Sequence, residues 1–221
     1  MARLNVIGEG LTEESFVRLV LAPFLGEHGV YAVSRSVETS RRHRAFRRGG
    51  MTDYARARGD IVRWLKQDRL ARVTTMFDFY ALPNDFPGFS SIPKGSLYDK
   101  VRHVETAVAA DVGNTRFIPY LQLHEFEGLL FSDVEVIDSE LAIEIGDSRL
   151  PQLNEITTAS ETPEHINDGY RTCPSRRLVD LFPRYQKATD GIRISKRIGI
   201  ASLRRKCVHF DEWVTRLVAL A

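Results

Sequence analysis

Short apolar segments rich in β-branched residues alternate along this chain with segments of helical periodicity. The strand candidates are residues 3–8, 30–37, 73–77 and 117–123. Helices are predicted between them, from Thr12 to about Phe24, from Thr52 to about Ala71, and from Ser96 to about Val112, with the first residue of each as its N-cap. This alternation predicts an α/β fold in which a mostly parallel central sheet is flanked by helices.

The pattern changes beyond residue 150. A loop-rich stretch to Pro174 is followed by a short helix from Ser175, a basic helix over 192–206 and a terminal helix that Asp211 is expected to cap. We therefore expect residues 1–150 to form the core and residues 151–221 to form a basic helical C-terminal extension packed on it.

Composition limits the expected location of the protein in the cell. Arg3 precedes a short apolar run that ends at Gly8, which is unlike a signal peptide, and the longest apolar runs are far shorter than the roughly 20 residues that span a bilayer. We expect a cytoplasmic protein that does not associate with membranes. The two cysteines, Cys173 and Cys207, form no CxxC pair, so neither a disulfide framework nor a zinc ribbon is indicated.

The formal net charge of +2 hides a segregation of charge along the chain. Residues 34–72 carry 12 Lys and Arg against 4 Asp and Glu, residues 73–170 carry 5 against 17, and residues 171–206 carry 11 against 2. Basic blocks attract a polyanion such as nucleic acid, whereas an acidic centre suits a divalent cation if its carboxylates converge. Solvated faces that balance one another are the alternative interpretation.

Acidic residues follow three predicted strands directly. Glu9 and Glu13 come after the first strand, Asp78 after the third, and Glu125 and Glu127 after the fourth. In parallel sheets the ligand site lies beyond the carboxyl ends of the strands, so these carboxylates are expected to meet there. Mg²⁺ or Mn²⁺ prefers such oxygen ligands, and two such ions would serve phosphodiester hydrolysis. Each residue alone also has a structural interpretation, as a helix N-terminal, capping or surface carboxylate.

The residues around these carboxylates resemble a known domain type. Residues 5–16, NVIGEGLTEESF, resemble the first motif of Toprim domains, in the EGxTE form of overcoming-lysogenization-defect-type nucleases. The resemblance implies a Toprim-like fold with Glu9 as metal ligand or general acid/base and Glu13 as a second ligand. Residues 75–80, TMFDFY, resemble the second motif, but Tyr80 stands where the second aspartate is usual. Whether the site holds one metal ion or two is therefore left open.

Further segments extend the resemblance. Residues 123–131, LHEFEGLLF, are similar to the acidic segment that supplies another ligand in the nuclease branch, and they favour Glu127 over Glu125. Together with PSRRL at 174–178, YQK at 185–187 and CVHFDEW at 207–213, nearly the whole chain resembles the DUF4276 family of Toprim-related bacterial proteins. That resemblance implies a partner ATPase of the ABC or structural-maintenance type, in mobile or anti-phage loci.

Basic residues are the candidates for contacting nucleic acid. Lys187 is expected near the scissile phosphate as a catalytic point charge, and Lys196 is a weaker candidate for the same place. Residues 41–50 are expected to be mobile without nucleic acid. The predicted nucleic-acid contacts are Arg41, Arg42, Arg44, Arg47, Arg48, Arg176, Arg177, Lys196 and Arg197. His124 adjoins the acidic segment, where a structural role is favoured over a catalytic one.

Three functions remain open. The leading hypothesis is an Mg²⁺- or Mn²⁺-dependent nuclease, acting on DNA or RNA in defence against foreign nucleic acid, with Glu9, Asp78 and Lys187 as catalytic residues. The alternative is a degenerate Toprim module that binds nucleic acid or an ATPase without cleaving. A phosphatase or nucleotidyl hydrolase with the same site is the third. No GxxxxGK[ST] loop occurs, so any ATP use is assigned to a partner. The sequence is compatible with a homo-oligomer but does not determine the oligomeric state.

Overall fold

A central sheet of five strands is parallel throughout. The computed structural model describes residues 1–36, 53–167, 169 and 171–221, so Thr52 and the predicted mobile stretch 41–50 with its five arginines lie outside the described residues. The strand order is β2-β1-β3-β4, and β5 continues alongside β3 after β4. The strands are β1 (Ala2–Gly8), β2 (Val30–Ser36), β3 (Arg72–Asp78), β4 (Phe117–Ile118) and β5 (Leu121–Gln122).

The strand predicted over 117–123 is divided into β4 and β5. Pro119 lies between the two pieces, and proline has no N–H to donate to a strand ladder. Both pieces still pair with β3, Phe117 beside Val73 and Leu121 beside Phe77. The segment therefore keeps its direction and delivers residues 123–127 to the same edge of the sheet as Asp78.

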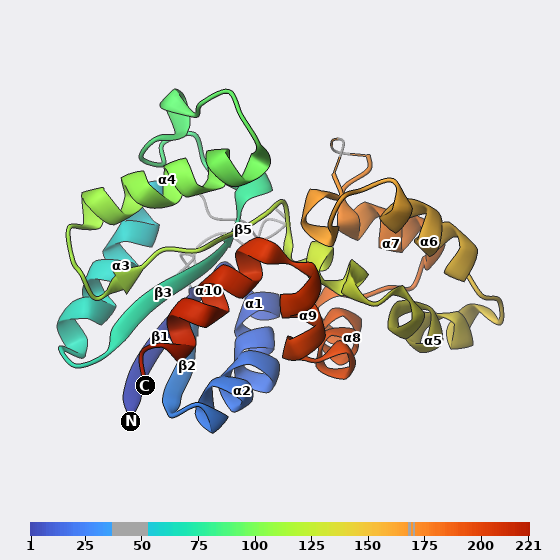
Figure 1. Ribbon diagram of the computed structural model, residues 1–221, viewed down its shortest axis with the longest axis horizontal. Coiled ribbons are helices and arrows are strands. Elements are labelled where there is room, and N and C mark those ends of the chain that lie inside the picture. Colours follow the sequence, from blue (N-terminus) through green and yellow to red (C-terminus); the bar gives the residue numbers. More distant parts are fainter. Residues whose placement is uncertain (37–52, 168, 170) are drawn as a thin grey trace, which may run out of the picture.

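Helices cover both faces of the sheet (Figure 1). On one face α3 (Tyr54–Gln67) and α4 (Leu97–Val112) pack on Ile7, Val73 and Phe77. On the other face α1 (Leu11–Phe16), α2 (Ala22–Glu27) and α10 (Val208–Val218) pack on Leu4, Val6 and Met76. Successive strand residues point to opposite faces, which explains how Val6 and Ile7 enter different cores. The α/β prediction is confirmed, and the arrangement is consistent with a Toprim-like layout.

The helix after β1 begins earlier than predicted. Gly10, not Thr12, is its N-cap, and Thr12 is buried in the first turn. A π-helical turn over Val17–Leu21 separates α1 from α2, and Pro23 lies in the first turn of α2, where its missing N–H is least costly. At α3 the N-cap is Asp53, whose side chain accepts from Arg56 N, and the helix ends at Gln67. The capping box of Ser96 and Asp99 is present as predicted.

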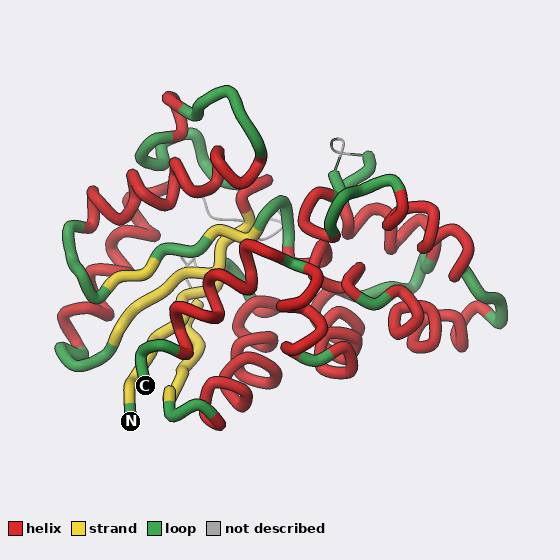
Figure 2. The backbone as a smooth tube through the Cα atoms, in the orientation of Figure 1, coloured by secondary structure: helices red, strands yellow, loops and turns green. Residues whose placement is uncertain are grey.

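The C-terminal part is more helical than predicted. The stretch expected to be loop-rich contains α6 (Leu150–Thr158), and the basic helix is divided at Gly199 into α8 (Ile192–Ile198) and α9 (Ile200–Lys206), because Gly199 has a positive φ of 76° that interrupts a helix. The remaining long elements are α5 (Val134–Ile145) and α7 (Pro174–Leu181). Short turns lie at Phe79–Ala81, Phe89–Ser91, Phe126–Ser132, Pro163–His165 and Lys187–Gly191. Figure 2 shows the part of the molecule that holds α5, α6 and α7 as helices and loops beside the strand-bearing part.

The terminal helix joins the two parts of the chain. It begins at Val208 after the N-cap Cys207, and Asp211 lies in its first turn as the partner of Arg204 rather than as its cap. Trp213 donates its indole N–H to Thr74 Oγ1 of β3 at 2.9 Å, and both side chains are buried. Residues from β1, α1, α8 and α10 belong to one apolar cluster. Residues 151–221 are therefore part of the main core.

None of the helices in the described residues combines the length and apolar character that a membrane crossing requires.

Candidate functional site

The first acidic segment is held against the end of β3. Because β1 and β3 are parallel neighbours, Glu9 and Asp78 leave the sheet at the same edge. Glu9 Oε2 accepts a hydrogen bond from Asp78 N at 3.2 Å, so the backbone of one acidic segment is tied to the carboxylate of the other.

Glu13 is turned back toward the sheet by the start of α1. Its Oε2 accepts from Gly10 N at 2.9 Å, which supplies one of the partners that a helix N-terminus needs. A Cβ at Gly8 would lie 2.7 Å from Glu13 Cβ, closer than real side chains approach. The close packing of α1 on β1 therefore requires glycine at position 8, which explains the Gly8-Glu9-Gly10 sequence on local structural grounds.

Asp78 and Glu127 complete the acidic side. Asp78 Oδ1 accepts from Phe126 N at 3.1 Å, which fixes the turn that follows β5 onto the end of β3. Glu127 lies one residue further on, fully buried, and no described residue gives either of its oxygens a well-aligned hydrogen-bond donor. A buried carboxylate without donors is costly unless a cation lies beside it.

That cation is Lys187, at the start of the π-helical turn before α8. Its Nζ lies 3.0 Å from Glu127 Oε2, 3.6 Å from Asp78 Oδ2 and 4.0 Å from Glu13 Oε1. The lysine side chain is 36% exposed, so solvent reaches the cluster from its side. We call Glu9, Glu13, Asp78, Glu127 and Lys187 the carboxylate–lysine cluster.

The cluster shifts the protonation equilibria of its members. Burial raises the pKa of Asp78 well above its usual range, and Glu13, Glu9 and Glu127 raise it further against the opposing charge of Lys187. Burial likewise raises the pKa of Glu127 to about 7, again against Lys187. Burial disfavours the charged lysine, but Asp78, Glu127 and Glu13 together outweigh it and hold the pKa of Lys187 well above its ordinary value.

Other acidic-segment residues have different surroundings. Glu125 accepts hydrogen bonds from Ser175 N and Ser175 Oγ, so it joins the turn after β5 to the start of α7. His124 has a positive φ of 60° and its Nδ1 lies 3.0 Å from Asn167 Nδ2. Burial lowers the pKa of His124 to about 4, so its imidazole is neutral at neutral pH. Tyr80 is 42% exposed, and its amide donates to His124 O.

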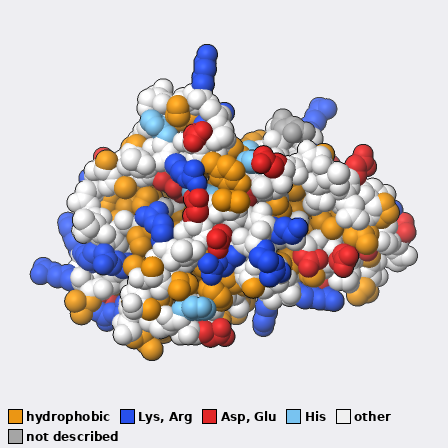
Figure 3. All heavy atoms as spheres, in the orientation of Figure 1, with side chains coloured by type: hydrophobic (Ala, Val, Ile, Leu, Met, Phe, Trp, Pro, Cys, Tyr) orange, Lys and Arg blue, Asp and Glu red, His pale blue; other side chains and the backbone are white. Residues whose placement is uncertain are grey.

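The described basic candidates lie on α7 and α8. Arg176 pairs with Asp180 at 3.0 Å, Arg197 pairs with Glu140 at 2.6 Å, and Arg177 donates to Thr172 O. Lys196 is exposed on α8 and makes no ion pair with a described residue. On the face shown in Figure 3 basic side chains lie among acidic ones. The five arginines of 41–48 lie outside the described residues.

Sequence reasoning missed the surroundings of Lys187. Tyr185 is buried, and its hydroxyl has no hydrogen-bond partner among the described residues. Burial together with the charge of Glu127 raises the pKa of Tyr185 well above the usual range. A Cβ at Gly191 would lie 2.9 Å from that hydroxyl, so the glycine makes room for the ring. The spacing of Tyr185 two residues before Lys187 was the only available signal.

The donor chemistry of the cluster suits a hard divalent cation, since every member except Lys187 offers carboxylate oxygen. In the part of the chain that the structure describes, however, no group of three or more His, Cys, Asp or Glu side chains is arranged to hold a metal ion. The lysine ammonium instead lies within 4.0 Å of the carboxylates of Glu13, Asp78 and Glu127. A cation would therefore have to replace or displace the ammonium.

A parallel sheet with acidic residues at its carboxyl edge defines an α/β protein with a carboxylate-rich site. The family model described as "Domain of unknown function (DUF4276)" matches residues 8–218, and the chain belongs to this family. The match includes every residue of the carboxylate–lysine cluster. Neither a curated protein nor a solved structure matches the chain.

Proposed function

We propose that this protein is a divalent-metal-dependent nuclease that hydrolyses phosphodiester bonds in DNA or RNA. The observation that carries the proposal is the convergence of three carboxylates, from three separate segments, on one partly exposed lysine at the carboxyl edge of the sheet, with Glu9 held beside them by Asp78 N. Such a concentration of negative charge is expensive to maintain and suits a site that handles cations and phosphates. The Toprim resemblance of residues 5–16 and 75–80 supports the same assignment.

Glu9, Glu13, Asp78 and Glu127 would hold Mg²⁺ or Mn²⁺, and Glu125 is engaged with Ser175. The bound ion would supply Lewis-acid stabilisation and a metal-activated water. Backbone amides already orient Glu9, Glu13 and Asp78, so little reorganisation of these three side chains is needed. With the carboxylates neutralised by such an ion, Lys187 would be available to bind a phosphate oxygen and stabilise negative charge there.

The direct test combines metal binding with cleavage. Mn²⁺ binding is measured by calorimetry, and plasmid, single-stranded DNA and tRNA are incubated with the chain in Mg²⁺ or Mn²⁺. We expect Glu9→Gln and Asp78→Asn to lose binding and cleavage, while Glu144→Gln, at an exposed position on α5, keeps both. Unchanged metal affinity in Glu9→Gln would remove the metal assignment.

A second candidate is a Toprim-related module that binds nucleic acid or an ATPase without cleaving. Tyr80 stands in place of the second aspartate, and Lys187 already neutralises part of the cluster without metal. This function predicts nucleic-acid affinity that falls steeply with salt, together with no cleavage under any metal condition.

We further propose that an ATPase of the ABC or structural-maintenance type activates the nuclease. The chain contains no GxxxxGK[ST] loop, and the family resemblance supplies the partner class. Cleavage by a mixture of chain and partner, and by neither alone, is the expected result, with Glu9→Gln as the inactive control. Equal cleavage by the chain alone would remove the need for a partner.

A further inference from the structure

Two aromatic side chains are exposed on the described surface, one at each edge of the sheet. Among the Phe, Trp and Tyr residues that the structure describes, Tyr31 and Tyr80 are exposed, at 59% and 42%, and the others are buried or half-buried. Tyr31 is the second residue of β2, at the amino edge. Tyr80 follows Asp78 by two residues, at the carboxyl edge that holds the carboxylate–lysine cluster. One exposed ring is therefore carried by the loop beside the candidate site.

The turn that carries Tyr80 is tied to the sheet and to the core. Tyr80 N donates to His124 O at 3.0 Å, which joins the turn after β3 to the turn after β5. Phe79 and Leu82, on either side of Tyr80, pack in the apolar core under α3 and α4. Two residues of chain span at most about 7 Å, so the backbone of Tyr80 stays close to Asp78. The exposed ring thus stands on a fixed backbone at the rim of the cluster.

The residue type at position 80 changes what this rim can bind. In the Toprim motif that residues 75–80 resemble, a second aspartate is usual here. Tyrosine adds no carboxylate to a cluster in which Lys187 is already the counter-ion, and it offers an aromatic face instead. Proteins that bind single strands combine a backbone-binding groove with aromatic side chains on which bases stack. Leu11, 74% exposed between Glu9 and Glu13 in the sequence, adds an apolar side chain beside the neighbouring strand end.

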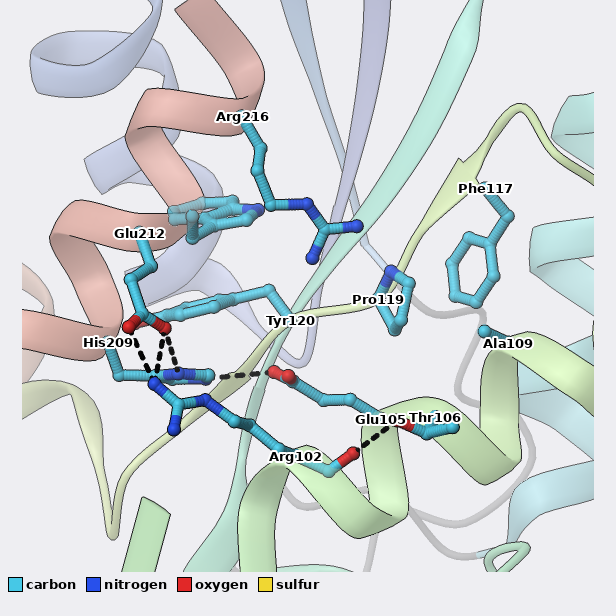
Figure 4. A pocket seen from close by; sticks show the side chains of 11 residues that line it. Arg102, Glu105, Thr106, Ala109, Phe117, Pro119, Tyr120, His209, Glu212 and Arg216 are labelled. Atoms are coloured by element: carbon cyan, nitrogen blue, oxygen red, sulfur yellow. Dashed lines mark hydrogen bonds and ion pairs between the residues drawn. The ribbon is translucent and has the colours of Figure 1, made fainter. Parts of the chain in front are cut away.

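The pocket between α4, the segment 117–120 and α10 has aromatic walls of a different kind (Figure 4). Tyr120 and Trp213 stack on each other with ring centroids 4.1 Å apart, and both are buried, as is Phe117. The guanidinium of Arg102 is held by both carboxylate oxygens of Glu212, at 2.6 and 2.8 Å. These groups are engaged within the protein, so they do not offer a ring face to a ligand.

We propose that the substrate is single-stranded nucleic acid and that the ring of Tyr80 stacks on an unpaired base beside the phosphate at the cluster. This inference rests on the proposed function and names the strand state of its substrate. In a duplex each base is stacked between its neighbours, so a surface side chain has no base face to contact. In a single strand a base can turn onto the ring while its phosphate meets Lys187, whose side chain is 36% exposed. Tyr80 is thus a specificity-determining residue.

Fluorescence anisotropy in EDTA measures binding without cleavage. The probes are one mixed-sequence oligonucleotide as single-stranded DNA, as single-stranded RNA and annealed to its complement. We expect at least one single-stranded probe to bind, and Tyr80→Ala to weaken it by about fivefold to 100-fold, the usual effect of losing one base–aromatic stack, with little change for the duplex. Tyr80→Phe keeps the ring and should bind like the wild type. Tyr31→Ala removes an exposed tyrosine from the opposite edge and is the matched control.

Stacking also has a direct optical readout. Tyr80→Trp keeps an aromatic platform, and the fluorescence of the added indole should be quenched when a single-stranded probe binds. The wild-type chain, with Trp64 and Trp213, provides the baseline. A purely structural role for Tyr80 would not produce this quenching. Thermal melting confirms that every variant is folded.

Three results would overturn the assignment. They are the failure of both single-stranded probes to bind the folded wild-type chain, equal single-strand affinities of Tyr80→Ala and Tyr31→Ala, and an equal loss of single-strand and duplex binding in Tyr80→Ala. Binding that depends on Tyr80 without cleavage in any metal would remove the nuclease assignment and keep the stacking role. Cleavage of single strands with the same rate and affinity in Tyr80→Ala would do the reverse.

Discussion

At the scale of single residues, Lys187 is the counter-ion of the buried carboxylates in the absence of metal. Its ammonium lies within 4.0 Å of three carboxylates, and Glu127 depends on this charge because no described residue gives either of its oxygens a well-aligned hydrogen-bond donor. A divalent cation attracted to the same oxygens would compete with the lysine. The metal-free structure is thus stabilised by the residue that a metal must displace.

Replacement of Lys187 by Met should therefore have opposite effects on stability and metal affinity. Removal of one partner from a buried ion pair costs about 3–5 kcal/mol, and we expect about 2 kcal/mol here because the lysine side chain is 36% exposed. Urea unfolding without metal should show this loss, and calorimetry should show tighter Mn²⁺ binding. Lys196→Met, at an exposed position, is the control. Weaker Mn²⁺ binding in Lys187→Met would contradict competition between lysine and metal.

The raised pKa of Glu127 predicts a pH dependence. Its folded pKa of about 7 exceeds the unfolded value of about 4.3, so between these pH values the folded state retains a proton that the unfolded state has lost. The contribution of Glu127 to the free energy of unfolding is therefore present at low pH and falls as pH rises through 7. Asp78 shifts in the same direction.

Urea unfolding from pH 5 to pH 8 without metal should show this decline, and Glu127→Gln should reduce its slope, with Glu144→Gln as the control. A slope in Glu127→Gln as steep as in the wild type would show that Glu127 does not titrate in this range. With metal present the stabilisation should instead increase toward pH 8, because ligand carboxylates must be deprotonated to bind.

At the scale of elements, the turn between β1 and α1 determines the position of Glu13. Gly8 lets the first turn of α1 pack on the end of β1, and Gly10 caps the helix while donating to the Glu13 carboxylate. Pro119 has a comparable effect on the other side of β3, because it divides the strand without removing β5 from its place beside Phe77. The glycine turn after β1 and the break at Pro119 both place acidic residues at the carboxyl edge of the sheet.

Gly8→Ala should separate α1 from β1. The added Cβ would lie 2.7 Å from Glu13 Cβ, and overpacking of this kind costs about 1–3 kcal/mol. We expect lower thermal stability and weaker Mn²⁺ binding. Gly26→Ala on α2 is the matched control, because nothing lies within 4 Å of its added methyl and alanine favours a helix by about 0.5–1 kcal/mol. Equal stability of the two variants would show that the Gly8 contact is not restrictive.

At the scale of the whole molecule, the C-terminal part completes both the core and the site. The apolar cluster that contains β1 and α1 also contains Ile194, Phe210 and Trp213, and Lys187 comes from the same part of the chain. Residues 1–150 expressed alone should therefore lack a cooperative thermal transition and near-ultraviolet circular dichroism, because the face of the sheet under α10 would be exposed to water. A cooperative transition in that fragment would show that it is an independent domain.

The sequence alone determined the parallel α/β arrangement, because strand and helix periodicities are local properties of the chain. It also placed Glu9, Asp78 and Glu127 at strand ends, since parallel strands end at one edge. Only the tertiary structure decided that Lys187 lies among them, that Glu125 binds Ser175, and that the buried His209 lies beside Glu105. These contacts join residues far apart in the sequence, and packing rather than periodicity determines which side chains meet.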